Sequence, residues 1–241
     1  MLIRLLSDIH SEFDLDQGRG FCEQQDPTGV DVLVLAGDIT VNHEETVFEV
    51  LSKKFKHILY VPGNHEYWHN HWQDTLMWAS QLEIKYPNVK FLNNNIVNID
   101  GRRFLGATLW TEEDQKNKHK EKFMNDFWMI SGGASQFIYS ENKKSEQFLR
   151  DNVEDGDIII THHLPSYDAI VPRWQGNHLN CFFANNLDDI LYSKKITWMW
   201  GHTHNSSYNV RLGNSVGYCN PRGYTPNGLN PEFDPKFIID I

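Results

Sequence analysis

Five short motifs in this chain combine aspartate, asparagine and histidine side chains with glycine, and each lies at or just after an apolar run. The motifs are Asp8-Ile9-His10, Gly37-Asp38, Gly63-Asn64-His65-Glu66, Thr161-His162-His163 and Gly201-His202-Thr203-His204. Their oxygen and nitrogen atoms are suitable ligands for two metal ions about 3.5–4 Å apart, an arrangement that hydrolyses phosphate esters. The types of these residues therefore predict a dinuclear metal site.

The spacing within two of the motifs supports this prediction. Side chains alternate between faces in an extended chain, so Asp8 and His10 would point the same way and chelate one cation. The same reasoning applies to His202 and His204. Each motif alone is equally typical of an ordinary strand end or turn. Because five such motifs with the same coordination chemistry occur at five strand ends, a metal site is favoured over five coincidences.

The motifs follow segments that the sequence predicts as buried strands. Continuous apolar runs, which are typical of strands covered on both faces, occupy 2–6, 31–36, 57–61, 157–161 and 196–200. Helices are expected over 43–55, 69–86, 141–152 and 183–193, and hairpin turns at Asp100-Gly101 and Gly213-Asn214. We therefore expect two sheets flanked by helices. The segment over 110–140 has no clear period, and we interpret it as a mobile cap near the site.

Length and composition restrict the class of protein. A chain of 241 residues, 40% of them hydrophobic, is long enough for one well-buried domain, so we predict a single domain over 1–241. The formal net charge of −10 argues against nonspecific nucleic-acid binding. The three cysteines are widely spaced, which argues against a disulfide framework, and the apolar start of the chain is too short for a signal peptide. We expect a cytoplasmic protein without a membrane segment.

The order of the motifs, from Leu2 to about His204, resembles the calcineurin-like metallophosphoesterase superfamily. The resemblance implies an α/β (α+β) fold, a four-layer α/β/β/α sandwich, where the strand pattern alone gives only mixed α and β structure. The segment Cys219-Asn220-Pro221-Arg222-Gly223-Tyr224 is similar to a bacterial or phage phosphohydrolase subgroup of that superfamily.

The resemblance also assigns seven metal ligands. The first metal would bind Asp8, His10 and His204, the second Asn64, His162 and His202, and both would bind Asp38. With one bridging hydroxide such a site has a net charge of about +1, and the hydroxide would attack phosphorus in line. We favour Mn²⁺, with Fe, Zn²⁺, Co²⁺ and Ni²⁺ as alternatives.

His65 would serve as the catalytic residue that donates a proton to the leaving-group oxygen. Some members of the superfamily orient this histidine with an aspartate three residues after the Gly-Asp pair. This chain has Val41 there, so we expect Asn42, Glu44 or a backbone carbonyl as the orienting partner.

The expected substrate is a small phosphodiester or nucleotide, because a site of this charge does not require the dianion of a monoester. Arg173 and Arg222 lie in loop-like stretches and are candidates for binding phosphate oxygens. Trp128, Trp174 and Tyr224 are candidates for stacking on a nucleobase. Two alternatives stay open: a protein Ser/Thr or other phosphomonoester phosphatase, and a non-catalytic scaffold on the same fold.

Overall fold

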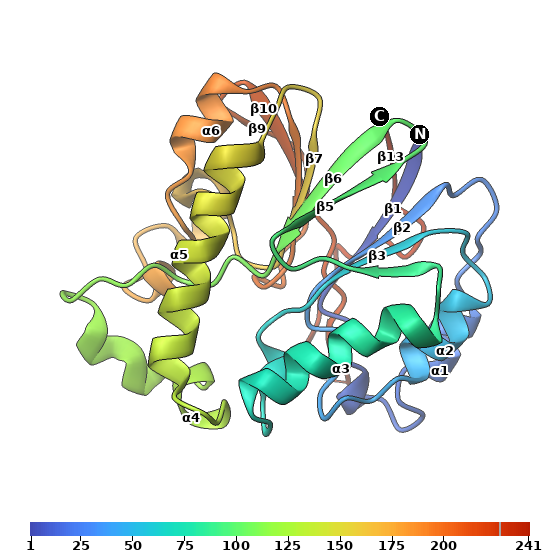
Figure 1. The fold of residues 1–241 in the computed structure, drawn as a ribbon, viewed down its shortest axis with the longest axis horizontal. Coiled ribbons are helices and arrows are strands. Elements are labelled where there is room, and N and C mark those ends of the chain that lie inside the picture. Colours follow the sequence, from blue (N-terminus) through green and yellow to red (C-terminus); the bar gives the residue numbers. More distant parts are fainter. Residues whose placement is uncertain (227) are drawn as a thin grey trace.

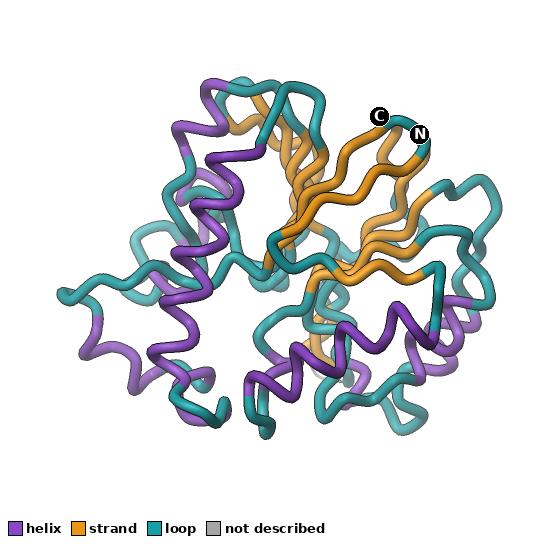
Figure 2. Tube along the Cα trace, in the orientation of Figure 1, coloured by secondary structure: helices purple, strands orange, loops and turns teal. Residues whose placement is uncertain are grey.

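The structure is a computed structural model that describes residues 1–226 and 228–241. Two β-sheets lie face to face in the middle of the molecule, and helices cover the outer face of each sheet (Figure 1, Figure 2). These four layers confirm the α/β/β/α sandwich that the motifs implied. Among the described residues, no helix is both long enough and apolar enough to cross a membrane.

The first sheet has five strands in the order β13-β1-β2-β3-β4. Its strands are β1 (Leu2–Leu6), β2 (Val32–Ala36), β3 (Ile58–Val61), β4 (Val89–Phe91) and β13 (Ile238–Asp240). Strands β1 to β4 are parallel, and β13 is antiparallel to β1. Leu6 pairs with Leu35, and Ala36 pairs with Val61, so the carboxyl ends of three successive strands lie side by side.

The second sheet has six strands in the order β5-β6-β7-β8-β10-β9. Its strands are β5 (Asn95–Ile99), β6 (Arg102–Ala107), β7 (Ile158–Thr161), β8 (Thr197–Trp200), β9 (Ser207–Leu212) and β10 (Ser215–Cys219). The central four are parallel, and the two edge strands form hairpins at the predicted turns. A separate two-stranded ribbon joins β11 (Gly223–Tyr224) to β12 (Gly228–Leu229).

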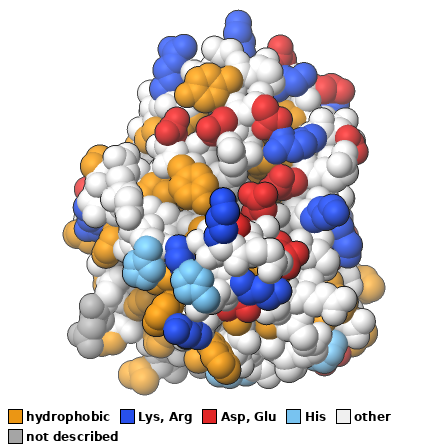
Figure 3. Space-filling model, turned by 90° about the vertical axis from the view of Figure 1, so that its left-hand side faces the viewer, with side chains coloured by type: hydrophobic (Ala, Val, Ile, Leu, Met, Phe, Trp, Pro, Cys, Tyr) orange, Lys and Arg blue, Asp and Glu red, His pale blue; other side chains and the backbone are white. Residues whose placement is uncertain are grey.

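Helices cover both sheets. The α-helices are α1 (Arg19–Glu23), α2 (Thr46–Ser52), α3 (Trp72–Lys85), α4 (Asp126–Met129), α5 (Ala134–Asn152) and α6 (Asp188–Ser193). The short 3₁₀ helices are η1 (Ser11–Phe13), η2 (His65–Tyr67), η3 (Lys118–Phe123), η4 (Tyr167–Ala169), η5 (Pro172–Trp174) and η6 (Asn180–Phe182). Helices α1 to α3 lie beside the first sheet, and α5 and α6 beside the second (Figure 1). Acidic and basic side chains are interspersed on the face that Figure 3 shows.

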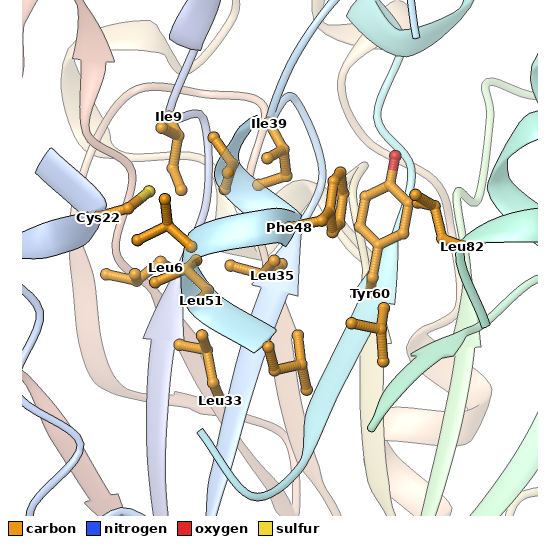
Figure 4. Packing of buried hydrophobic residues seen from close by; sticks show 14 of the residues in the cluster. Leu6, Ile9, Cys22, Leu33, Leu35, Ile39, Phe48, Leu51, Tyr60 and Leu82 are labelled. Atoms are coloured by element: carbon orange, nitrogen blue, oxygen red, sulfur yellow. The ribbon is translucent and has the colours of Figure 1, made fainter. Parts of the chain in front are cut away.

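Alternation along each buried strand divides the core into layers. Val32 and Val34 of β2 pack between the two sheets, whereas Leu33 and Leu35 pack with Phe48 of α2 on the outer side (Figure 4). The second sheet repeats this pattern on its own outer face, beneath α5 and α6. Since both faces of these strands are buried, they are continuous apolar runs in the sequence.

The predicted strands agree with the observed ones to within one residue, but all four predicted helices differ. Helix α2 is three residues shorter at each end than the predicted 43–55, and α3 begins at Trp72 rather than 69. The other two helices differ more. Helix α5 begins at Ala134 rather than 141, because its first turns pack Phe137 against Trp110 in a separate apolar cluster. Helix α6 begins at Asp188 rather than 183, because the Asn185 side chain binds backbone carbonyls of neighbouring loops and holds the preceding chain in a non-helical path. The cap role of segment 110–140, and its mobility, stay predictions.

Candidate metal centre

The five motifs, far apart in the sequence, meet where the parallel strands of both sheets end. The first sheet supplies residues that follow β1, β2 and β3, namely Asp8, His10, Asp38 and Asn64. The second sheet supplies residues that follow β7 and β8, namely His162, His202 and His204. Because the sheets pack face to face, their strand ends bring these side chains into two adjoining groups.

Asp8, His10 and His204 form the first group of potential ligand atoms, which lie within 4.8 Å of one another. The Nε2 atoms of His10 and His204 are 3.0 Å apart, and His204 Nε2 is 3.4 Å from Asp8 Oδ1. Asp8 also accepts a hydrogen bond of 2.9 Å from the backbone N–H of His202. This bond joins the end of β1 to the end of β8, which supplies His202 and His204.

Asp38, His162 and His202 form the second group, and Asn64 lies beside them. His162 Nε2 is 3.3 Å from Asp38 Oδ2 and 3.0 Å from Asn64 Oδ1. The same oxygen of Asp38 is 3.7 Å from His10 Nε2 in the first group. Asp38 thus occupies the central position that a bridging ligand requires.

The protonation of His202 and Asp38 fits metal binding. Burial would lower the pKa of His162, but the carboxylate of Asp38 raises it to about 9, so this ring must lose a proton before it binds a metal ion. The Nε2 atom of His202 is buried and has no hydrogen-bond partner among the described residues. Burial and the neighbouring His163 imidazole hold the pKa of His202 well below its ordinary value, so this ring is neutral. Burial alone would raise the pKa of Asp38, but the imidazoles of His162 and His65 hold it well below its ordinary value. Neutral imidazole and ionised carboxylate are the forms that bind metal ions.

The backbone of the ligand residues is left-handed rather than extended. Five of the seven have positive φ, namely Asp8 (50°), His10 (50°), Asp38 (54°), His202 (71°) and His204 (49°). Asp8 and His10 converge as predicted, but not by alternation in an extended strand, because the chain turns sharply as each strand ends. For His202 and His204 the prediction that they chelate one cation together was wrong, because they lie in different groups. Such conformations cost about 1–3 kcal/mol each in non-glycine residues and are concentrated at functional sites.

Two motif glycines are required by close approach of neighbouring side chains. A Cβ atom on Gly37, whose φ is 86°, would lie 2.2 Å from Nδ1 of His162. A Cβ atom on Gly63 would lie 2.1 Å from Oδ1 of Asp38. No other residue type fits at these positions without displacing a candidate ligand.

Glu66, the last residue of its motif, holds two of the ligand loops together. Its buried carboxylate accepts backbone hydrogen bonds from Asp38 at 3.1 Å, from Ile39 at 2.7 Å and from Gly63 at 2.7 Å. Burial and the charge of Asp38 raise the pKa of Glu66 to about 7. Glu66 therefore joins the loops after β2 and β3 without facing the ligand groups itself.

His65 begins η2 rather than lying in the extended turn that its motif predicted. Its ring stacks on Trp68 with the ring centroids 3.5 Å apart, and its Nε2 is 4.0 Å from Asp38 Oδ2. Burial lowers the pKa of His65, but the carboxylates of Asp38 and Glu12 outweigh this effect and raise it. A histidine that keeps its proton beside the ligand groups is suited to donating one.

The partner that orients His65 is Glu12, which the motifs do not identify. Glu12 Oε1 lies 3.1 Å from Nδ1 of His65 and 3.1 Å from Nδ1 of His10. The expectation of Asn42, Glu44 or a backbone carbonyl was wrong, and Glu44 instead accepts the Thr46 N–H at the start of α2. The position of Glu12, two residues after His10, was the available signal.

The shared contact with Glu12 fixes both imidazoles. Burial would raise the pKa of Glu12, but its bonds to His10 and His65 lower it, so the carboxylate is ionised. An ionised carboxylate only accepts hydrogen bonds, so both rings donate from Nδ1 and direct Nε2 toward the ligand groups.

A second residue without a motif comes from the segment over 110–140. Asp126 of α4 is buried and accepts hydrogen bonds from Asn64 Nδ2 and from Trp68 Nε1, both of 2.8 Å. The first bond turns the amide oxygen of Asn64 toward His162, and the second fixes the indole on which His65 stacks. Only the tertiary position of this segment brings Asp126 to the centre.

A cavity of about 480 Å³ adjoins the ligand groups, and Asp38, His65 and His202 lie in its wall. Trp174 and Tyr224, which we expected near a substrate, also line it. Trp128 does not: its side chain is 72% exposed on the outside of α4.

Neither predicted phosphate-binding arginine is among the described residues that line the cavity. Arg222 donates to Asp14 through Nη1 at 2.6 Å and Nη2 at 3.2 Å, and its role in binding substrate stays a prediction. Its pairing ties the C-terminal segment to the loop after β1. Arg173 is exposed, and its Nε donates to Asn205 at 3.2 Å, next to His204.

Comparison with known proteins identifies relatives of this chain. Residues 1–206 match the family model described as calcineurin-like phosphoesterase. The uncharacterized protein L509 of Acanthamoeba polyphaga mimivirus is 29% identical over 273 residues, which cover 100% of this chain and 96% of that protein.

Solved structures share the fold. Phosphopantetheinyl hydrolase (PptH) from Mycobacterium tuberculosis has a TM-score of 0.72 at 14% identity, covering 99% of this chain and 98% of that one. The protein TT1561 of Thermus thermophilus has a TM-score of 0.57 at 14% identity, covering 91% of this chain and 88% of that one. At these identities the similarity shows a common architecture.

Proposed function

The chain belongs to the calcineurin-like phosphoesterase family, as its motifs predicted, and on this premise we propose that it hydrolyses small phosphodiesters or nucleotides with two divalent cations. The observation that carries this proposal is the convergence of two groups of oxygen and nitrogen donors on one oxygen of Asp38. A cavity large enough for a small ligand opens beside that oxygen.

Seven side chains would hold the cations. Around one position are Asp8, His10 and His204, around the other Asn64, His162 and His202, and between them Asp38. Cations bound there would supply Lewis-acid stabilisation of the phosphoryl oxygens and would activate water for attack on phosphorus. A set of nitrogen and oxygen donors without thiolate suits Mn²⁺, which we favour, as well as Fe, Zn²⁺, Co²⁺ and Ni²⁺.

His65 would protonate the leaving group. Glu12 holds its Nδ1–H, and Trp68 covers one face of the ring, so Nε2 is directed toward the centre. As the P–O bond breaks, Nε2 would donate its proton to the departing oxygen, which otherwise leaves as an unstable alkoxide.

The charges around the centre support a singly charged substrate. A diester carries one negative charge, whereas a monoester carries close to two at neutral pH. Arg222 is paired with Asp14, so Arg173 alone of the two arginines is proposed to reach a non-bridging phosphate oxygen. A diester, with its single negative charge, therefore needs no basic side chain besides Arg173.

The test is hydrolysis by the Mn²⁺-reconstituted protein of bis(p-nitrophenyl) phosphate, p-nitrophenyl phosphate and small cyclic nucleotides. We expect kcat/KM for the diesters to equal or exceed that for the monoester, and Arg173→Ala to lower it. The phosphopantetheinyl hydrolase that shares this fold is a reason to add a phosphopantetheinyl ester. A monoester preference that Arg173→Ala leaves unchanged would support the phosphomonoesterase alternative. Two bound ions without hydrolysis of any ester would support the scaffold.

A further inference from the structure

On the premise of the phosphoesterase function above, we propose that the cavity binds an uncharged aromatic group of nucleobase size, carried by an ester that has no second phosphate. Three features of the cavity support this inference: its apolar walls, the exposed aromatic side chains among them, and the charges of its polar groups. The reacting phosphate would lie at Asp38 and the histidines, and the aromatic group would occupy the space beyond them.

The walls of the cavity are rich in apolar and aromatic side chains that come from separate parts of the chain. Beyond the ligand groups, these are Trp68, Phe123, Met124, Ile170, Val171, Trp174, Leu179, Phe183 and Tyr224. A volume of about 480 Å³ falls within the range of small-molecule sites. Flat aromatic walls favour a planar group, because stacking and edge contacts contribute beyond the area that they bury.

Several large aromatic side chains that line this cavity are exposed to solvent. Phe123 of η3 is 58% exposed, Trp174 of η5 is 48% exposed and Tyr224 of β11 is 37% exposed. Tyr224 is fixed in place, since its ring lies 4.4 Å from that of His10 and 4.5 Å from that of His204, centroid to centroid. Clustered exposed apolar surface beside a polar centre is typical of a ligand site.

The polar groups of the cavity argue against a second phosphate. Among the residues that the structure describes, neither Lys nor Arg lines it, whereas the carboxylates of Asp38 and Asp126 do. The remaining polar lining includes the uncharged residues Asn125, Asn177 and Asn180, which offer a phosphate no cationic partner. A further dianionic group would have to be desolvated there without a cationic partner.

Three cyclic phosphodiesters distinguish the effect of the base from the effect of a second phosphate. Adenosine 2′,3′-cyclic phosphate and methyl β-D-ribofuranoside 2′,3′-cyclic phosphate share the same reactive five-membered ring and the same sugar, and differ in the base. Adenosine 2′,3′-cyclic phosphate with an added 5′-phosphate differs from the first only in that dianionic group. We expect the base to lower KM about 10-fold, within the range that stacking on aromatic side chains produces, and the 5′-phosphate to reverse that gain.

Two tryptophan variants test whether the lower KM of the adenosine substrate arises in the cavity. Trp174→Ala should bring the KM ratio between the adenosine and methyl riboside substrates close to one. Trp128→Ala is the matched control, because this tryptophan is exposed and lies outside the cavity, and it should leave the ratio unchanged. A KM ratio near one in the unmodified protein, or a lower KM with the 5′-phosphate, would overturn the proposal.

A binding measurement tests the cavity independently of ester hydrolysis. We expect calorimetry to detect adenosine binding to the full-length protein, weaker in Trp174→Ala, whereas ribose does not bind. If adenosine binds in this way but no ester is hydrolysed, the cavity assignment stands and the proposed function fails. If esters are hydrolysed without regard to the base and adenosine does not bind, the cavity assignment fails alone.

Discussion

Glu12 offers a direct test of the site, because one of its oxygens contacts two imidazoles with different proposed roles. Oε1 is 3.1 Å from Nδ1 of His10, a proposed metal ligand, and 3.1 Å from Nδ1 of His65, the proposed proton donor. Glu12→Ala removes both contacts at once. We predict that this variant binds metal more weakly and also loses rate with leaving groups that need a proton.

The size of each effect follows from the contact that is lost. Removing the partner that orients a metal-binding histidine lowers metal affinity about 10–100-fold. A hydrogen bond to a charged group contributes about 1.5–3 kcal/mol, and each 1.4 kcal/mol is a factor of about ten, so turnover should fall about 10–100-fold for an alkoxide leaving group. The loss should be small for nitrophenolate, which departs without a proton. Glu12→Asp keeps the charge on a shorter side chain and should recover part of both losses.

Calorimetric titration with Mn²⁺ measures the first effect, and turnover at saturating Mn²⁺ with bis(p-nitrophenyl) phosphate and a cyclic nucleotide measures the second. Glu44→Ala is the matched control, because Glu44 is a nearby carboxylate that bonds to Thr46 in α2. An unchanged Mn²⁺ affinity in Glu12→Ala, with equal rate losses for both leaving groups, would refute the reasoning.

Four further substitutions test other parts of the centre. Asp38→Asn should lower the occupancy of both metal positions, and Asn64→Ala should lower mainly the occupancy of the second. Metal analysis of the purified variants measures both effects. Two bound ions per chain with full activity in Asp38→Asn would rule out a bridging role for Asp38. His65→Ala should keep both ions and lose about 10²–10⁴-fold in turnover with an alkoxide leaving group but far less with a nitrophenyl ester. An equal loss would indicate that His65 only positions the substrate. Asp126→Ala should weaken the second position about 10–100-fold in a Mn²⁺ titration, because the Asn64 amide loses the acceptor that orients it, and an unaltered titration would contradict this role.

The five strands that precede the motifs could be predicted from the sequence because burial on both faces gives each of them an apolar run. Helix boundaries were harder to predict from the sequence, since they depend on contacts between distant segments. The early start of α5 depends on the packing of Phe137 against Trp110, and the late start of α6 depends on side-chain bonds of Asn185 to Leu109 and Leu164. No local pattern encodes such contacts.

The candidate ligands could be recognised because few residue types bind metal ions and all of them lie at strand ends. Their geometry could not be predicted, because the sequence does not show that Asp8 and His10 both adopt positive φ. The pairing of Arg222 could not be predicted for the same reason. Arg222 was predicted from its charge and its loop, but Asp14 on another loop takes its donors.

Three carboxylates that are not candidate ligands complete the centre, Glu66 and Asp126 buried and Glu12 partly buried, and each binds a different kind of donor. Glu66 accepts backbone N–H groups, Glu12 accepts from two imidazoles, and Asp126 accepts from an amide and an indole. A carboxylate is costly to bury unless it is hydrogen-bonded, and each of these three has at least two donors.

The same bonds hold the ligand loops in backbone conformations that cost about 1–3 kcal/mol per residue and would otherwise relax. Asp38, with a φ of 54°, is held by the bond from its N–H to Glu66, and His10, with a φ of 50°, by the contact of its ring with Glu12. The ligand motifs are therefore necessary but not sufficient for the centre. A chain that kept the seven ligands and lost these carboxylates would match the same sequence pattern without fixing the directions in which its ligands point.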